Sequence, residues 1–338
     1  MSRSSKKVIA NIPYSFDIER GSRIAVTMGD PKGIGPEVIR KALAELVKKN
    51  NEGTQRPCVT ASEAKVLMPD TRSCSQSHFI IVGDKNLLGR IDPSVEVIDV
   101  PYKSAGEGSL KFLDKAIGLI KGGFAQALVT APLSKEAVSH YAKNFVGHTE
   151  YLAQAFEVKK FDMMFIAPQM RLTIVTRHVP LRDVPKLITQ KSVFDSIELM
   201  ARTLKDKFKI RDPKIAVLGL NPHAGEGGLL GLEDIKHILP AINKAKAQGI
   251  NAKGPIPADT FFAFYRDRNP YDGIIAMYHD QGLAPLKGMY MKQLVNFTAG
   301  LPFVRTSPAH GTAFDIAGKN KADPSSMIAA LKLACELA

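Results

Sequence analysis

DGIIAMYHDQGLAPLKGMYMKQLVNFTAGLPFVRTSPAHGTAFD, residues 272–315, is the stretch that decides the fold class of this chain. Its apolar residues 274–277 are typical of a buried strand, and they lead directly into a polar loop that contains His279 and a glycine. Strands that end in polar, glycine-containing loops are where α/β proteins place their chemistry. We therefore expect one metal ligand and most of an anion-binding pocket in this stretch.

Alternating strands and helices fill the rest of the chain. Short apolar runs predict strands, longer amphipathic segments predict helices, and their alternation indicates a mostly parallel sheet with helices on both faces. The predicted strands are residues 24–27, 79–82, 95–100, 127–130, 163–167, 172–176 and 215–220, and the predicted helices include residues 110–123, 187–207 and 233–248. The expected fold class is therefore α/β.

Length, composition and charge limit the possible functions. A chain of 338 residues can hold two domains or one large α/β unit. The net charge of +13 fits a solvated basic surface, a nucleic-acid partner or an anionic small molecule. The densest basic run, residues 202–214, is interleaved with aspartates, and the chain has no zinc-knuckle spacing and no tryptophan. We therefore expect no nucleic-acid partner.

Cysteine usage and hydropathy point to the compartment. Three cysteines without CxxC spacing do not suggest a disulfide framework, and they fit a reducing environment. No apolar run approaches the roughly 18 residues that are needed to cross a membrane. Residues 1–21 lack the apolar core of a secretory signal and are expected to be an N-terminal extension. The expected protein is cytoplasmic and has no membrane partner.

Residues 28–37, MGDPKGIGPE, follow the first predicted strand, residues 24–27. Three glycines permit a sharp turn with uncovered amide groups, and Pro36 suits the first turn of a helix. This order of strand, glycine loop and helix N-terminus forms an anion or cofactor rim, although a merely tight turn has the same pattern. The spacing G-x3-G-x-G is not the G-x-G-x-x-G of dinucleotide-binding folds, so a Rossmann fold is not predicted.

Three histidines share one context. His178, His223 and His279 each follow an apolar strand and precede a loop that contains proline or glycine. Equivalent ends of parallel strands converge at one edge of a sheet, where three imidazoles can hold a divalent ion and leave coordination positions open. A single such histidine would more often be structural, but the matching context of three favours a metal site. Zinc suits the ligands, and cobalt, magnesium or manganese remain alternatives.

Lys287, Asn296 and Arg305 are evenly spaced donors with no acid assigned to neutralise them. Such a set suits a phosphate, because arginine can donate hydrogen bonds to two phosphate oxygens at once while lysine supplies a point charge. A role in surface solubility is the alternative for each residue alone. A metal site and a phosphate clamp together suggest a phosphorylated small-molecule substrate.

Seven motifs together carry a resemblance to a known family, and they span almost the whole chain after residue 23. The chain resembles the 4-hydroxythreonine-4-phosphate dehydrogenases, which are NAD-dependent enzymes of pyridoxal 5′-phosphate biosynthesis. The motifs are MGDPKGIGPE at 28–37, GHTE at 147–150, LNPHAGEGG at 220–228, GPIPADT at 254–260, AMYHDQG at 276–282, LPFVRTS at 301–307 and HGTAFDIAG at 310–318. LNPHAGEGG and YHDQG are highly specific in combination.

The resemblance implies a role for each candidate residue. The metal ligands would be His178, His223 and His279; the substrate contacts would be His148, Thr149, Lys287, Asn296 and Arg305; the catalytic acids and bases would come from His148, Asp259 and Asp280; and the cofactor contacts would be Gly311 and Asp315. The cofactor would be NAD or NADP. The implied reaction is oxidation of 4-phosphooxy-L-threonine at C3, followed by decarboxylation to 3-amino-2-oxopropyl phosphate.

The resemblance also implies an architecture. The expected fold is the two-domain fold of isocitrate and isopropylmalate dehydrogenases, with a cofactor-side domain at residues 22–139 and 299–338. A metal, substrate and dimerisation domain would take residues 140–298. Enzymes of this family are homodimers whose metal site draws histidines from both subunits, so the active site is expected at the subunit interface.

Three other functions stay open. A sister group oxidises 4-phospho-threonate or 4-phospho-erythronate with the same metal and phosphate residues. Gly227 and Leu283 favour the vitamin-pathway enzyme, whereas residues 131–135 look more like the sister group. A phosphotransacetylase-like acyltransferase and a non-catalytic phosphometabolite-binding protein are less favoured, because neither needs three histidines at strand ends.

Overall fold

The computed structural model describes residues 21–51, 74, 77–266 and 268–338. The expected N-terminal extension, residues 1–21, lies outside the described residues apart from its last residue. Eleven strands in the described part form one sheet, in the order β3-β2-β1-β4-β11-β10-β5-β6-β9-β7-β8. Most neighbouring strands are parallel, so the predicted α/β fold with a mostly parallel sheet is confirmed.

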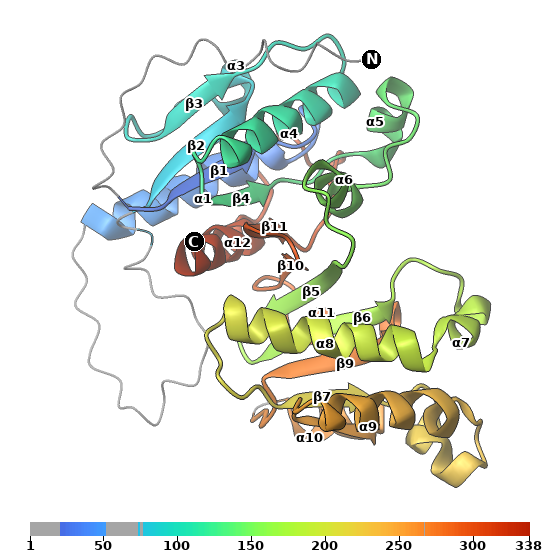
Figure 1. Cartoon of the computed structure of the whole chain (residues 1–338). Coiled ribbons are helices and arrows are strands. Elements are labelled where there is room, and N and C mark those ends of the chain that lie inside the picture. The colour runs from blue at the N-terminus through green and yellow to red at the C-terminus, as the bar shows by residue number, and fades with distance from the viewer. Residues whose placement is uncertain (1–20, 52–73, 75–76, 267) are drawn as a thin grey trace.

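The first part of the sheet is parallel. It is formed by β1 (Arg23–Thr27), β2 (His78–Gly83), β3 (Glu96–Asp99), β4 (Ala127–Thr130) and β11 (Val304–Pro308). Helix α4 (Ala105–Lys121) covers one face, while α1 (Gly35–Asn51) and α12 (Ser325–Leu337) pack against each other on the opposite face (Figure 1). Buried aliphatic side chains fill the strands, which is typical of a parallel sheet covered on both sides.

Two antiparallel strands join this part to the rest of the sheet. Strand β10 (Val295–Ala299) pairs antiparallel with both β11 and β5 (Asp162–Ala167). Strand β5 then forms a hairpin with β6 (Met170–Thr176), in which Met164 lies opposite Thr173. The hairpin was predicted from the two apolar runs, whereas β10 and β11 were not predicted as strands.

The second part is again parallel and contains β6, β9 (Gly273–Tyr278), β7 (Ile215–Leu218) and β8 (Ala252–Ile256). Helices α8 (Gln190–Asp206) and α9 (Leu239–Ala247) pack on one face. Helices α10 (Ala258–Phe264) and α11 (His279–Tyr290) contribute Phe261, Leu283 and Leu286 to a separate apolar cluster on the other face. The two-domain division stays a prediction, because one sheet runs through both expected domains.

The end of β6, which precedes His178, and the loop after β4 lie where the two parallel parts join. Neighbouring strands rotate by roughly 20–25° relative to each other, so the direction of the strands changes greatly across eleven of them. Helices α5 (Lys135–Tyr141) and α6 (His148–Ala155) lie beside this junction (Figure 1). No helix within the described ranges is long and apolar enough to span a membrane.

Candidate active site

A cavity of about 210 Å³ lies at the junction of the two parallel parts. The loop after β4, the first turn of α6, strands β10 and β11, the end of β6 and the loop after β11 form its wall. Its polar lining residues are Thr130, Lys135, His148, Thr149, Glu150, His178, Asn296, Arg305, Ser307 and His310. Five residues that were predicted to bind substrate or metal therefore share one cavity.

Arg305 supplies the buried positive charge of this cavity. It lies on β11 and is only 2% exposed, and its guanidinium donates to Thr130 Oγ1 at 2.6 Å and Thr298 Oγ1 at 3.1 Å. Burial lowers the pKa of Arg305 to about 10, so the guanidinium stays charged at neutral pH. Its Nε has no partner, and no carboxylate lies within 4.0 Å of it in the described part of the chain. A buried cation without an acid is costly, and an anionic ligand would balance it.

Asn296 and the start of α6 complete an anion pocket around Arg305. Asn296 lies on β10 opposite Ser307 and lines the cavity, where its Nδ2 is the group that can donate to an anion. Gly147 precedes α6 and offers no side-chain cap, so the first amide groups of the helix remain available. Such amide groups, together with the helix dipole, bind phosphate or carboxylate. We call Arg305, Asn296 and the first turn of α6 the anion pocket.

His148, at the start of α6, is held in its neutral form. Burial lowers its pKa well below the usual value of 6.5, and the positive charges of Arg305 and Lys135 lower it further. At neutral pH, one ring nitrogen of His148 is therefore free to accept a proton. An unprotonated nitrogen is one requirement of a general base; a pKa near the working pH is the other, and the burial of His148 opposes it.

His178 and His279, two of the three predicted metal ligands, lie close to each other. His178 follows β6, His279 begins α11, and their ring centroids are 5.6 Å apart. Nδ1 of His279 lies 2.7 Å from Oδ1 of Asp280, so the carboxylate can accept a hydrogen bond from it. A carboxylate that holds Nδ1 of a histidine in this way directs Nε2 toward a metal and raises its basicity.

His223 does not join the other two histidines within one chain. Among the residues that the structure describes, no group of three or more histidine, cysteine, aspartate or glutamate side chains could hold a metal ion. His223 is exposed in the turn Pro222–Gly228, where its φ of 52° is left-handed. Asp234 holds the start of this loop by accepting from Leu220 N at 2.9 Å and Asn221 N at 3.2 Å. We call His178, His223 and His279 the histidine edge.

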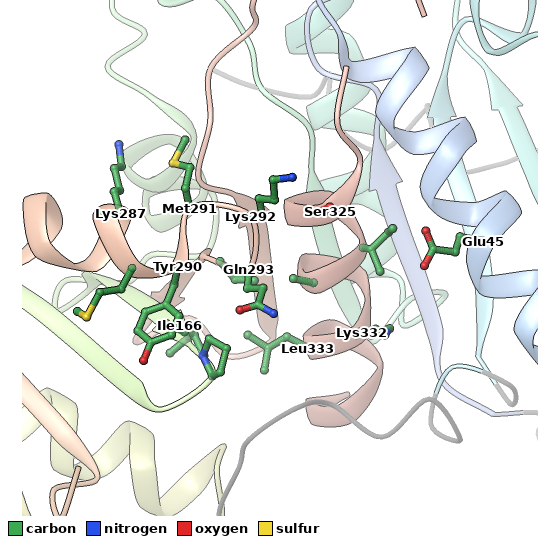
Figure 2. Close-up of a pocket in the computed structure, with 17 residues that line it drawn as sticks. Glu45, Ile166, Lys287, Tyr290, Met291, Lys292, Gln293, Ser325, Lys332 and Leu333 are labelled. Atoms are coloured by element: carbon green, nitrogen blue, oxygen red, sulfur yellow. The ribbon is translucent and has the colours of Figure 1, made fainter. Parts of the chain in front are cut away.

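Three other predicted residues lie outside the cavity wall. Asp259 is exposed at the start of α10, and Asp280 is exposed beside His279. Lys287, on α11, lines a different cavity of about 630 Å³ between the end of α11, the β5–β6 turn and α12. Its side chain points away from Tyr290 and Leu333 in Figure 2. The larger cavity contains no histidine, so we place the chemistry in the smaller one. The roles of these three residues stay predictions.

The predicted cofactor residues lie on the loop after β11. Gly311 lines the cavity, and Asp315 is exposed farther along the loop. Glu37 of α1 anchors the loop by accepting from Ala322 N at 2.8 Å and Asn320 N at 3.2 Å. A second pocket of about 440 Å³ lies between this loop, the glycine loop after β1, and α3 (Lys85–Leu88). The glycine loop, which was expected to form an anion or cofactor rim, therefore lies beside the loop that carries the predicted cofactor residues.

Sequence reasoning did not single out Lys135, Glu150 and His310 as site residues. Lys135 and Glu150 occur in ordinary helix-start patterns, and His310 appeared only as the first residue of the HGTAFDIAG motif. His310 Nδ1 lies 3.0 Å from the carbonyl oxygen of Gly311, and its Nε2 is buried without a partner. Only their positions at the junction, which depend on strands far apart in sequence, could have identified them.

The described part of the chain is an α/β protein whose cavity combines a buried guanidinium, a neutral histidine and an imidazole at a strand end, a set of side chains that suits an anionic ligand. The chain belongs to the family described as "Pyridoxal phosphate biosynthetic protein PdxA", which matches residues 28–334. The resemblance stated from the sequence motifs is thereby confirmed.

Named relatives and solved structures give the same family. A 4-hydroxythreonine-4-phosphate dehydrogenase of Sulfurihydrogenibium sp. (strain YO3AOP1) is 39% identical, with 92% of this chain and 97% of the relative covered. A protein of Oceanobacillus iheyensis, provisionally named D-threonate 4-phosphate dehydrogenase, is 40% identical, with 93% and 97% covered. The crystal structure of 4-hydroxythreonine-4-phosphate dehydrogenase from Klebsiella pneumoniae matches with a TM-score of 0.76 at 34% identity, covering 94% and 98%. The chain is a dehydrogenase of this family.

Proposed function

We propose that the chain oxidises 4-phosphooxy-L-threonine at C3 with NAD or NADP, and that decarboxylation then gives 3-amino-2-oxopropyl phosphate for pyridoxine 5′-phosphate biosynthesis. The observation that carries this proposal is Arg305, a buried cation without an acid partner in a cavity that also contains His148 and His178. The family and its named dehydrogenases support the reaction class.

The anion pocket would bind the phosphate. Arg305 and Asn296 would contact the phosphate oxygens, and the amide groups of His148 and Thr149 would complete the site at the start of α6. Lys287 would have to turn toward the phosphate or reach the site of a second subunit, because it does not line this cavity. This arrangement would fix one end of the substrate and leave C3 near the histidines.

A divalent ion fits the histidine edge once a third ligand is supplied. His178 and His279 would hold it, and Asp280 would orient His279. His223 would come from the second subunit of a homodimer, since its exposed loop cannot complete the site within one chain. The ion would lower the pKa of the C3 hydroxyl when bound. Zinc, cobalt, magnesium and manganese are all compatible with imidazole and water ligands.

His148 is the favoured general base. It lines the cavity and is uncharged at neutral pH, so a ring nitrogen would be available for the proton of the C3 hydroxyl, and a bound phosphate beside it would raise its lowered pKa. Asp259 and Asp280 are less favoured for this role, because both are exposed and neither lines the cavity. The nicotinamide would receive the hydride from C3, and Gly311 and Asp315 would contact the cofactor along the loop that Glu37 anchors.

The reaction can be tested with purified protein. NADH or NADPH formation would be measured with 4-phosphooxy-L-threonine, 4-phospho-threonate and 4-phospho-erythronate, each with and without a chelator. Reduction of the cofactor with the threonine derivative, abolished by the chelator, is expected. Absence of a reduced cofactor with every acid would refute the dehydrogenase reaction.

A second substrate has specific support. The relative provisionally named D-threonate 4-phosphate dehydrogenase is about as similar to this chain as the 4-hydroxythreonine-4-phosphate dehydrogenases are. The two acids differ at C2 by an amine or a hydroxyl group. A kcat/KM that is higher for the threonate derivative than for the threonine derivative would assign the chain to that alternative.

A further inference from the structure

The polar side chains of the cavity lie on one face of three neighbouring strands, β4, β11 and β10. Arg305 of β11 pairs with Leu128 of β4, so Thr130, two residues farther along β4, faces the same side as Arg305. Asn296 of β10 pairs with Ser307, which is two residues from Arg305 and therefore shares its face. The cavity is lined by Thr130, Asn296, Arg305 and Ser307. The side chain of Thr130 therefore points to the same side as those of the anion pocket.

The hydroxyl group of Thr130 is a hydrogen-bond acceptor toward Arg305. The guanidinium donates to Thr130 Oγ1 at 2.6 Å, and because a guanidinium carries only donors, the hydrogen of the hydroxyl cannot point toward it. Thr130 is 0% exposed, and no residue that the structure describes accepts a hydrogen bond from its hydroxyl. The wall of the cavity therefore contains a buried O–H donor that lacks an acceptor, which is costly unless a ligand supplies one.

Thr298 provides a comparison within the same molecule. It lies on β10, is 1% exposed, and its Oγ1 accepts from the guanidinium of Arg305 at 3.1 Å. Unlike Thr130, it does not line the cavity. Both threonines therefore hold the guanidinium from the two flanking strands, but only Thr130 is in a position to contact a ligand in the cavity.

We propose that Thr130 binds the phosphate of the substrate by donating its hydroxyl hydrogen to a phosphate oxygen beside Arg305. This inference rests on the proposed function, in which the anion pocket binds phosphate. The hydroxyl accepts from the guanidinium and donates to the anion, so it contacts both partners of the ion pair. A hydrogen bond to an anionic oxygen is stronger than one between neutral groups. Thr130 is thus a further substrate-binding residue, in addition to Arg305 and Asn296.

The test measures binding by calorimetry, without cofactor or turnover. Wild type, Thr130→Val and Thr130→Ser would be titrated with inorganic phosphate and with 4-phosphooxy-L-threonine. Thr130→Val keeps the shape of the side chain but loses the hydroxyl, so both affinities should fall about ten- to hundredfold. Thr130→Ser keeps the hydroxyl and should bind both ligands nearly as tightly as the wild type. Thr130→Ala, which also lacks the hydroxyl, takes the place of Thr130→Val if thermal melting shows that the valine variant does not fold.

The matched variant is Thr298→Val, which removes an acceptor of Arg305 without removing a donor to the ligand. It should weaken phosphate binding only about threefold. Equal losses in Thr130→Val and Thr298→Val would mean that Thr130 only positions Arg305, and this result would overturn the proposal. Unchanged affinity in Thr130→Val, or a Thr130→Ser variant as weak as Thr130→Val, would overturn it as well. If the wild type binds neither ligand, the phosphate site of the proposed function fails, and the role of Thr130 fails with it.

Discussion

The anion pocket and the histidine edge lie side by side, but one chain completes only the first. Arg305 and Asn296 lie on adjacent strands of the sheet, and Arg305 is bonded to Thr130 of a third. His223 instead lies in an exposed loop, apart from the paired rings of His178 and His279. The pairing of β10 with β11 fixes the positions of Asn296 and Arg305. The position of His223 depends instead on what packs against its exposed loop. We therefore expect the anion pocket to bind phosphate with residues of one chain, and the histidine edge to bind a metal ion with residues of two chains.

Loss of a histidine of the histidine edge should lower activity more than any other change. It also tests whether this region, unlike the anion pocket, needs two chains. His178→Ala and His223→Ala should each lower kcat about a thousandfold or more, because a divalent ion contributes several kcal/mol to catalysis. Mixing the two inactive variants should restore about a quarter of the wild-type activity, since half of the dimers then contain one intact site. NADH formation after refolding the mixture measures this. A mixture that stays inactive would contradict a histidine edge shared between subunits.

Arg305→Met should remove the function of the anion pocket with little loss of stability. We expect kcat/KM to fall about a hundredfold or more, because removal of a buried charge from its ligand costs roughly 2–5 kcal/mol. The melting temperature should change little, since the buried cation forms no ion pair within 4.0 Å in the described part of the chain and only the more distant Glu150 favours its charge.

The matched control for Arg305 is Arg171→Met. Arg171 is also buried, but it donates to the carbonyl oxygen of Asp272 at 3.2 Å and does not line the cavity. Its loss should lower stability without selectively weakening phosphate binding. Similar phosphate affinities for Arg305→Met and wild type in calorimetry would contradict the assignment of the anion pocket.

Asp280→Asn should lower the metal affinity of the histidine edge only moderately. Asp280 is exposed and contacts His279 rather than the ion itself, so metal affinity should fall about tenfold. Titration with zinc or cobalt, followed by calorimetry, measures the change. Phosphate affinity should not change. A loss as large as that of His178→Ala would mean that Asp280 is itself a ligand.

Glu37→Gln should have the smallest effect of the proposed changes. It should lower the stability of the protein by loosening the loop that joins the anion pocket to the predicted cofactor residues. Burial raises the pKa of Glu37, but hydrogen bonds from Lys41, Ala322 and Asn320 outweigh it and lower the pKa below 4.5. The ionised carboxylate therefore contributes stability above pH 4.5, and this contribution is lost as the pH falls below that value.

At pH 7, Glu37→Gln should lower the free energy of unfolding by about 1–2 kcal/mol. Urea unfolding at pH 7 and pH 3 measures the difference, which should become smaller at the lower pH. A difference that grows on acidification would contradict this role of the carboxylate.

Several elements of the fold could be predicted from local patterns. The runs of β1, β2, β3, β4, β5, β6, β7 and β9 were identified with small shifts at their ends. Strands β8, β10 and β11 were missed, because their sequences contain proline, lysine, asparagine or arginine where a run of aliphatic residues was expected. Two of the three missed strands contribute to the anion pocket, where polar residues replace apolar ones on buried strands.

The sequence by itself determined the α/β class, the family and the residue types of the site. Apolar runs and specific motifs are local properties, and each is complete within a few tens of residues. Only the tertiary structure decided which polar side chains share a cavity, because the contact between Arg305 and Thr130 joins residues 175 positions apart. It also placed Lys135 in the cavity, and left Lys287 and Asp259 outside it. Those positions depend on strand order and helix packing, which no local pattern specifies.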